Sequence, residues 1–281
     1  MPDLSPVTDI LLATDLGPRC DRALMRAVSL ASRWRANLHM LLVIEPGERP
    51  TWEDDDIVDR ATNEVAGIVG ELPIDWRVLV RRGPVDEAVL EVTRETGSQI
   101  VLVGMAVNEF LGRARPGRLV DILLRRSPVP ILMVKKARVE EYRHIVAPTD
   151  FSAVSEWAIL KAMSLFPASS LSILHAYQIP FAGFLGQDNA KGIRDAATAE
   201  TLAFVHRLGE KLDFASPPSV HLEQGNPEVL LRSLTRSGGV DLTVVGAHPT
   251  WDMQRHAGDL AGRLLMASAS DVLAVPGAQQ G

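Results

Sequence analysis

The sequence is poor in several features that mark whole classes of protein. It has one cysteine, Cys20, among 281 residues, so no disulfide can form within the chain. Its apolar runs, such as Ile100–Val103, are far shorter than the roughly 20 residues that a membrane-spanning helix needs. No succession of charged, apolar and small residues resembling a signal peptide opens the chain. These features predict a cytoplasmic protein that does not enter a membrane.

The sequence also lacks an excess of positive charge. Residues 1–138 hold 19 Lys and Arg against 20 Asp and Glu, a net charge of −1, and residues 139–281 hold 10 against 15, a net charge of −5. Neither half therefore has the basic surface that nucleic-acid binding requires. The five tryptophans are scattered, which does not suggest a platform for stacking bases. We expect no nucleic-acid partner.

A catalytic or metal-binding set of residues is missing as well. Cys20 falls in the first predicted helix and has no close histidine to activate its thiol. His248 and His256 flank Asp252, but no cysteine or closely spaced histidine completes a metal site. We therefore predict no catalytic residue and no metal ligand.

What the sequence does contain is a long internal repeat. The segment Ile10–Leu16 (ILLATDL) returns as Ile145–Phe151 (IVAPTDF), 135 residues later. The segment Val101–Met105 returns as Thr243–Ala247, 142 residues later. Solenoid repeats are much shorter than this period. The repeat therefore predicts two whole domains.

Each half alternates short apolar runs with longer amphipathic stretches, which is typical of βαβ units around a parallel sheet. We predict two tandem doubly wound α/β domains, 1–138 and 139–281, joined near residues 136–142. Each has a five-stranded parallel sheet in the order 3-2-1-4-5 with helices on both faces. The predicted strands lie near 9–14, 37–44, 75–81, 99–104 and 130–135, and near 143–148, 170–176, 219–223, 241–246 and 271–275. In the first half, helices are expected near 19–34, 54–71, 84–96 and 117–126.

In such a sheet a ligand belongs at the carboxyl ends of the strands, near the switch point between strands one and four. In the first half, Asp15 follows strand one, Gly104 ends strand four, and Gly117 begins the next helix. Glycines let backbone N–H groups approach phosphates, and a helix N-terminus favours anions. This combination predicts a nucleotide cradle.

The order of these motifs resembles the universal stress protein family, here in tandem over most of the chain. The resemblance is carried by the strand and Asp15, by Val103-Gly104, by the helix that begins Gly117-Arg-Leu119, and by Ser127-Pro-Val-Pro-Ile-Leu-Met-Val134. It implies a stress-response binding or scaffold protein that is not an enzyme. It also implies a cleft for ATP or another adenine nucleotide in domain 1, with Mg²⁺ alongside it.

In ATP-binding members of that family the loop after strand four reads Gly, two residues, Gly, nine residues, Gly, then Ser or Thr. Gly104 and Gly117 keep this spacing, but Val107 replaces the second glycine and Arg118 replaces the hydroxyl residue. The guanidinium of Arg118 can neutralise phosphates instead. The candidate nucleotide-binding residues are Asp15, Val43, Gly104, Val107, Gly117, Arg118 and Leu119.

The second half departs further from this pattern. Pro249 stands at the second glycine position, and Gly258 arrives one residue early and is followed by Asp259, whose carboxylate repels an anion. We interpret Asp150 and Ser152 as a helix cap and its turn. No nucleotide is expected in domain 2.

Two other functions stay open at this point. One is a weak ATPase or nucleotide-transfer enzyme using the domain 1 cleft, which would need a metal and a group to position water. The other is a sensor of an apolar ligand through domain 2, in which the aromatic loop 178–186 lines the site.

Partners are predicted from the fifth strand of each half, which commonly mediates pairing in the family. Ile131–Val134 and Val272–Val275 would be the matching apolar edges, and such an edge needs a partner. We expect the two domains to form an intramolecular pseudo-dimer, with a homodimer and protein partners as further options.

Overall fold

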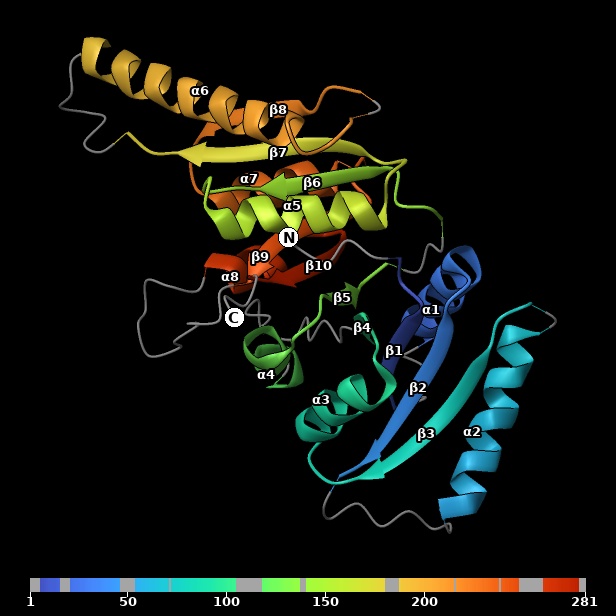
Figure 1. Cartoon of the computed structure of the whole chain (residues 1–281). Helices are drawn as coiled ribbons and strands as arrows, with labels where there is room; N and C mark the ends of the chain where they lie inside the picture. The colour runs from blue at the N-terminus through green and yellow to red at the C-terminus, as the bar shows by residue number, and fades with distance from the viewer. Residues whose placement is uncertain are drawn as a thin grey trace. The chain divides into compact units, whose positions relative to one another are not determined.

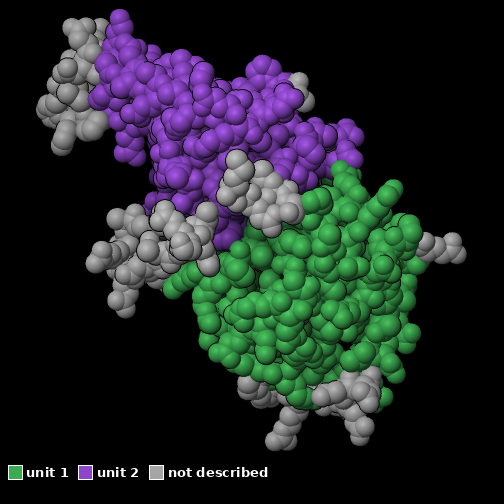
Figure 2. All heavy atoms as spheres, viewed as in Figure 1, with its two compact units in different colours: residues 1–140 green, residues 141–281 purple. Residues whose placement is uncertain are grey.

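The computed structural model describes most of the chain. The described residues are 6–15, 21–45, 54–70, 72–104, 118–136, 140–179, 187–214, 216–237, 239–247 and 260–277. The chain divides into two compact units, Met1–Glu140 and Glu141–Gly281, which we call unit 1 and unit 2 (Figure 2).

Unit 1 is built around a parallel sheet in the order β3-β2-β1-β4-β5 (Figure 1). Its strands are β1 (Asp9–Thr14), β2 (Asn37–Ile44), β3 (Trp76–Arg82), β4 (Ile100–Gly104) and β5 (Ile131–Val134). Its helices are α1 (Asp21–Trp34), α2 (Asp54–Val69), α3 (Val85–Thr96) and α4 (Arg118–Arg126). Right-handed crossovers place α1 and α2 on one face of the sheet and α3 and α4 on the other.

Unit 2 repeats this arrangement with its strands in the order β8-β7-β6-β9-β10. Its strands are β6 (His144–Pro148), β7 (Ser170–Tyr177), β8 (Ser219–Gln224), β9 (Leu242–Ala247) and β10 (Asp271–Pro276). Its helices are α5 (Ala153–Leu165), α6 (Gln187–Gly209), α7 (Pro227–Arg236) and α8 (Leu260–Ala267). Counted from its own first strand, the order is again 3-2-1-4-5, so the predicted fold is confirmed in both units.

The central strands form the core of each unit. Ile10, Leu11 and Leu12 in β1 are fully buried, and so are Ile145 and Val146 in β6. Strands covered on both faces read as continuous apolar runs, which made the central strands easy to find, and the sequence located all ten strands to within about one residue at each end. The outer strands β3 and β8 are only partly covered. In the described part of the chain, no helix is long and apolar enough to cross a membrane.

Candidate functional site

A cavity of about 440 Å³ opens at the carboxyl ends of β6, β7 and β9 in unit 2. Its size is within the range of small-molecule pockets, and it lies at the switch point of the sheet, where doubly wound folds hold their ligands. Strand ends, the turn after β6, and the first residues of α5, α7 and α8 supply its walls. The lining residues are Pro148, Thr149, Asp150, Ser152, Val154, Ser155, Leu174, His175, Ala176, Pro227, Val245, Gly246, Leu260, Ala261 and Leu264.

The turn between β6 and α5 is fixed by its own side chains. The backbone N–H of Phe151 donates to Thr149 Oγ1 at 2.9 Å, and that of Ser152 donates to Asp150 Oδ1 at 3.0 Å. The hydroxyls of Thr149 and Ser155 are 2.8 Å apart and share a further hydrogen bond. These bonds hold Phe151 in the left-handed region at φ 62°, which few residues with a side chain adopt. The cavity therefore has one rigid wall.

Ser152 caps α5, because its Oγ accepts from the N–H of Ser155 at 3.2 Å. This confirms the interpretation of Ser152 as a helix cap and of Asp150 as part of its turn. Burial by itself raises the pKa of the Asp150 carboxyl, but hydrogen bonds from Ser152 and Ser155 outweigh it and hold the pKa below its ordinary value. Asp150 therefore presents an ionised carboxylate at the cavity.

His175 contributes a second acceptor to the same cavity. Its Nδ1 lies 2.9 Å from the carbonyl oxygen of Thr149, and a carbonyl only accepts, so Nδ1 carries the proton. In the neutral ring Nε2 is then left with its lone pair. Phe151 stacks on the imidazole with ring centroids 4.2 Å apart and an interplanar angle of 26°. The orientation and the tautomer of His175 are both set by this surrounding turn.

Gly246 lines the cavity where β9 passes under the first turn of α5. A Cβ at this position would lie 2.8 Å from Cγ1 of Val154 and 2.9 Å from its carbonyl oxygen. Real side chains do not approach so closely, so only glycine fits beneath α5. The Val-Gly pattern near the end of strand four thus has a packing reason in unit 2.

The chemistry of this cavity favours a ligand that donates hydrogen bonds. Most of its lining is apolar, and its polar groups are hydroxyls, the Asp150 carboxylate and the His175 ring. Among the described residues that line it, there is no Lys or Arg to neutralise a phosphate. Sequence reasoning missed His175, although its place near the end of the second strand of the repeat was a usable signal.

In unit 1, the structure brings three of the predicted site residues to one edge of the sheet. Thr14 pairs with Leu42, and Ala13 pairs with Val103. Asp15 and Val43 follow the first pair and lie level with each other, and Gly104 follows Val103 and lies level with Thr14, one residue before Asp15. All three are therefore close together at the carboxyl ends. Arg118 and Leu119 begin α4. Val107 and Gly117 lie outside the described residues.

Several other sequence predictions also fall outside the described residues. These are Cys20, Asp252, the two histidines His248 and His256, and most of the loop 178–186. Within the ranges that the structure covers, no group of three or more His, Cys, Asp or Glu side chains is arranged to hold a metal ion.

Comparison with known proteins adds a family to this geometry. The model of the universal stress protein family matches twice, over residues 6–135 and 141–276. A universal stress protein from Archaeoglobus fulgidus DSM 4304 superposes with a TM-score of 0.70 at 16% identity, covering 95% of this chain and 98% of that one. A functionally unknown protein from Pseudomonas aeruginosa PAO1 gives a TM-score of 0.68 at 18% identity, over 98% and 94% of the two chains. At this identity the likeness shows the fold. No curated protein matches the sequence.

Proposed function

The chain belongs to the universal stress protein family, and from this premise we propose that it acts by binding a small molecule at the carboxyl ends of its strands, without turnover. The cavity of about 440 Å³ in unit 2 is the observation that supports this proposal most strongly. Its size suits a ligand, its wall is rigid, and it lies at the expected end of the sheet.

For unit 2, the proposed ligand is a compound with an apolar ring-shaped body that carries hydrogen-bond donors such as amino or hydroxyl groups. The carboxylate of Asp150 and Nε2 of His175 accept hydrogen bonds, and apolar side chains such as Leu174 and Val245 receive the body of the ligand. A neutral or cationic compound fits these acceptors better than a polyphosphate does, because two negative charges repel each other.

For unit 1, the proposed ligand is ATP or another adenine nucleotide, with Mg²⁺ alongside it. The adjacency of Asp15, Val43 and Gly104 supports this placement. Arg118, in the first turn of α4, brings a positive charge near the helix N-terminus, and both features favour phosphate. Val107, Gly117 and Leu119 complete the proposed site as the sequence predicts it.

Two matched variants test the two clefts separately. Val43 is the seventh residue of β2, and Ala176 is the seventh residue of β7, so they hold equivalent places. Ala176 lines the unit 2 cavity, and a tryptophan there should fill it. We expect Ala176→Trp to abolish binding of adenosine, used as an uncharged ring compound with donors, and to leave ATP binding unchanged. Val43→Trp should do the reverse.

Isothermal titration of the full chain, with and without Mg²⁺, measures both affinities. Circular dichroism of each variant checks that it has folded. Absence of saturable binding of either probe to the parent chain would contradict the proposal. Equal loss of both probes in a single well-folded variant would contradict the assignment of one ligand to each unit.

We also propose a stress-response role in the cytoplasm, with association through the fifth strands. Within their own units, β5 and β10 are edge strands of apolar sequence, and such edges favour pairing. Light scattering over a range of concentrations measures whether copies of the chain associate. A constant monomer mass would contradict a homodimer.

A further inference from the structure

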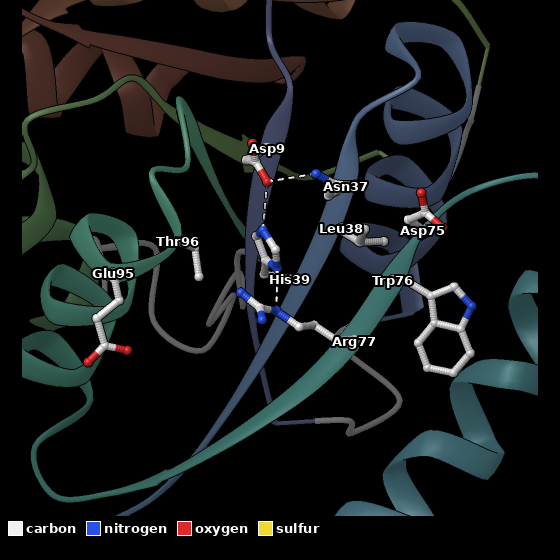
Figure 3. Close-up of a pocket in the computed structure, with 9 residues that line it drawn as sticks. All are labelled: Asp9, Asn37, Leu38, His39, Asp75, Trp76, Arg77, Glu95 and Thr96. Atoms are coloured by element: carbon white, nitrogen blue, oxygen red, sulfur yellow. Dashed lines mark hydrogen bonds and ion pairs between the residues drawn. The ribbon is translucent and has the colours of Figure 1, made fainter.

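A second pocket lies in unit 1, at the amino ends of β1, β2 and β3 and therefore at the opposite end of the sheet from the proposed nucleotide cleft. Its volume is about 370 Å³. Figure 3 shows that Asp9, His39 and Arg77 lie in a line across the three strands, while Glu95 of α3 lies apart from them to one side. The pocket thus combines charged groups of both signs.

The hydrogen bonds define which atom carries each proton. Nε of Arg77 lies 2.9 Å from Nδ1 of His39, and a guanidinium only donates, so Nδ1 accepts. The other ring nitrogen, Nε2, then carries the proton of the neutral ring and donates to Asp9 Oδ1 at 2.9 Å. His39 is only 6% exposed. A buried imidazole therefore fixes the orientation of the Arg77 guanidinium from behind.

The carboxylate of Asp9, at the other end of this series of hydrogen bonds, is held in its ionised form. Burial by itself raises the pKa of Asp9, but hydrogen bonds from Asn37, His39 and Thr8 lower it further than burial raises it. The amide of Asn37 donates to Oδ1 of Asp9 at 3.0 Å. Asp9 is thus occupied by neighbours of its own unit and serves to position His39 and, through it, Arg77.

Two charged side chains of the pocket keep unused hydrogen-bonding atoms. In the part of the chain that the structure describes, the terminal nitrogens Nη1 and Nη2 of Arg77 donate to no group, and the carboxylate of Asp75 accepts from none. Glu95 differs, because it is paired with Arg81 at 2.8 Å. Asp75 is two residues before Arg77, and in an extended chain the Cα atoms of two such residues are roughly 7 Å apart. The terminal nitrogens of Arg77 and the carboxylate of Asp75 are therefore both available in residues that line the same pocket.

Unit 2 carries the same three positions with different chemistry. The strand registers match Asp9, His39 and Arg77 with residues that also form a hydrogen-bonded chain. These residues are His144, Ser172 and Ser219. His144 Nε2 lies 2.6 Å from Ser172 Oγ, which lies 2.5 Å from Ser219 Oγ. Hydrogen-bonded side chains thus link three strands in both units. At these matched positions, only unit 1 has a guanidinium, that of Arg77.

We propose that this pocket of unit 1 binds a small zwitterion, a free α-amino acid. A simple anion would be attracted by Arg77 but repelled by Asp75 and Asp9, and a simple cation would be repelled by Arg77. An amino acid satisfies both free groups. Its carboxylate takes a bidentate pair from Nη1 and Nη2 of Arg77, and its ammonium pairs with Asp75 and with the side-chain amide oxygen of Asn37.

The first test measures binding by the full chain. Each of the standard L-amino acids, added singly at millimolar concentration, is screened by thermal shift, and the strongest is titrated calorimetrically. We expect saturable binding at one site per chain. The methyl ester and the N-acetyl derivative of that amino acid should each bind at least about tenfold more weakly, because each removes one charge-assisted pair. No binding by any amino acid, or full affinity of either derivative, overturns the proposal.

Matched variants then locate the site. Arg77→Gln and Asp75→Asn should each weaken binding at least about tenfold, the cost of one charge-assisted pair. Ser219→Ala, at the matching position of unit 2, should leave the affinity unchanged. Both Asp75 and Arg77 are exposed, so circular dichroism should show folded variants. ATP binding should persist in all three, which separates this site from the proposed nucleotide cleft. Unchanged affinity of Arg77→Gln overturns the proposal.

Discussion

At the scale of single residues, Gly246 shows how packing can demand a glycine that sequence alone would assign to a ligand. The ideal Cβ position falls 2.8 Å from Val154 Cγ1 and 2.9 Å from backbone, so neither atom can easily give way. A glycine near the switch point of the sheet is therefore no proof of a nucleotide cradle. Such a glycine can equally well be required because a helix packs closely against the strand.

We predict that Gly246→Ala lowers the free energy of unfolding by about 1–3 kcal/mol, the usual cost of overpacking. Urea denaturation measures this change. Gly192, within α6, is a matched control, because a Cβ there meets nothing within 4 Å. Gly192→Ala should be neutral or should stabilise the protein by up to about 1 kcal/mol. Equal stability of the two variants would contradict the packing argument.

Asp9 gives a prediction for pH. Burial raises its pKa, but the stronger effect of its hydrogen bonds leaves the pKa of the folded state below the ordinary value of 3.8. The unfolded state then binds the proton more readily, so Asp9 contributes stability above pH 4 that is lost as the pH falls through its folded pKa. Asp9→Asn should remove this part of the acid dependence.

The measurement is the midpoint of urea denaturation from neutral pH down to about pH 3 for the parent chain and Asp9→Asn. The two midpoints should converge as the pH falls. If the gap between them stays constant or widens in acid, the ionised carboxylate is not the stabilising form, and this account of Asp9 is wrong.

The hydrogen-bonded side chains that link three strands in each unit are contacts that the sequence could not predict. Asp9, His39 and Arg77 are separated by 30 and 38 residues, and nothing in their spacing suggests contact. They meet only because the register sets His39 beside Arg77 and places Asp9 one pleat away on the same face. Cross-strand register is fixed by the whole sheet and not by any local pattern.

At the scale of the elements, the strands were predicted more accurately than the helices. A central parallel strand is an apolar run with sharp ends, so β1 and β2 begin and end where the sequence placed them. Helix ends are softer, and α2 ends at Val69, two residues before the predicted end. The turn after β6 was recognised because Asp150 and Ser152 are good capping residues.

A buried pair connects the beginning and the end of unit 2. The hydroxyl of Tyr142, just before β6, donates to Asp271 Oδ2 at 2.7 Å, and Asp271 is fully buried at the start of β10. The Tyr142 ring also packs edge-to-face on Phe166, with centroids 5.0 Å apart. The ring and the hydroxyl thus make separate contributions.

We predict that Tyr142→Phe lowers the free energy of unfolding by about 1–3 kcal/mol, because a buried carboxyl oxygen loses a donor while the ring contact stays. Ser237→Ala removes an exposed hydroxyl that donates to Leu234 O, and should cost less than about 0.5 kcal/mol. Thermal denaturation compares the two. A loss no greater for Tyr142→Phe than for the exposed control would rule out a structural role for this hydroxyl.

At the scale of the whole molecule, the two units have the same fold but different residues at their candidate sites. The two units share the strand order and a glycine at or next to the end of the fourth strand, Gly104 in β4 and Gly246 in β9. They differ in the residues at the sheet ends, where Val43 and Arg77 of unit 1 correspond to Ala176 and Ser219 of unit 2. The repeat therefore predicted the architecture, because architecture depends on the shared pattern. It could not predict the sites, because these depend on residues that differ between the two units.

The most direct test of ligand binding at the carboxyl ends is an NMR titration of adenosine into the isotope-labelled 281-residue chain. We predict saturable shifts of the amide signals of Thr149, His175 and Gly246, which line the unit 2 cavity. The amide signals of Asp9 and Asn37, at the amino ends of the strands of unit 1, should not shift. Shifts that do not saturate, or that avoid the cavity residues, would contradict the account.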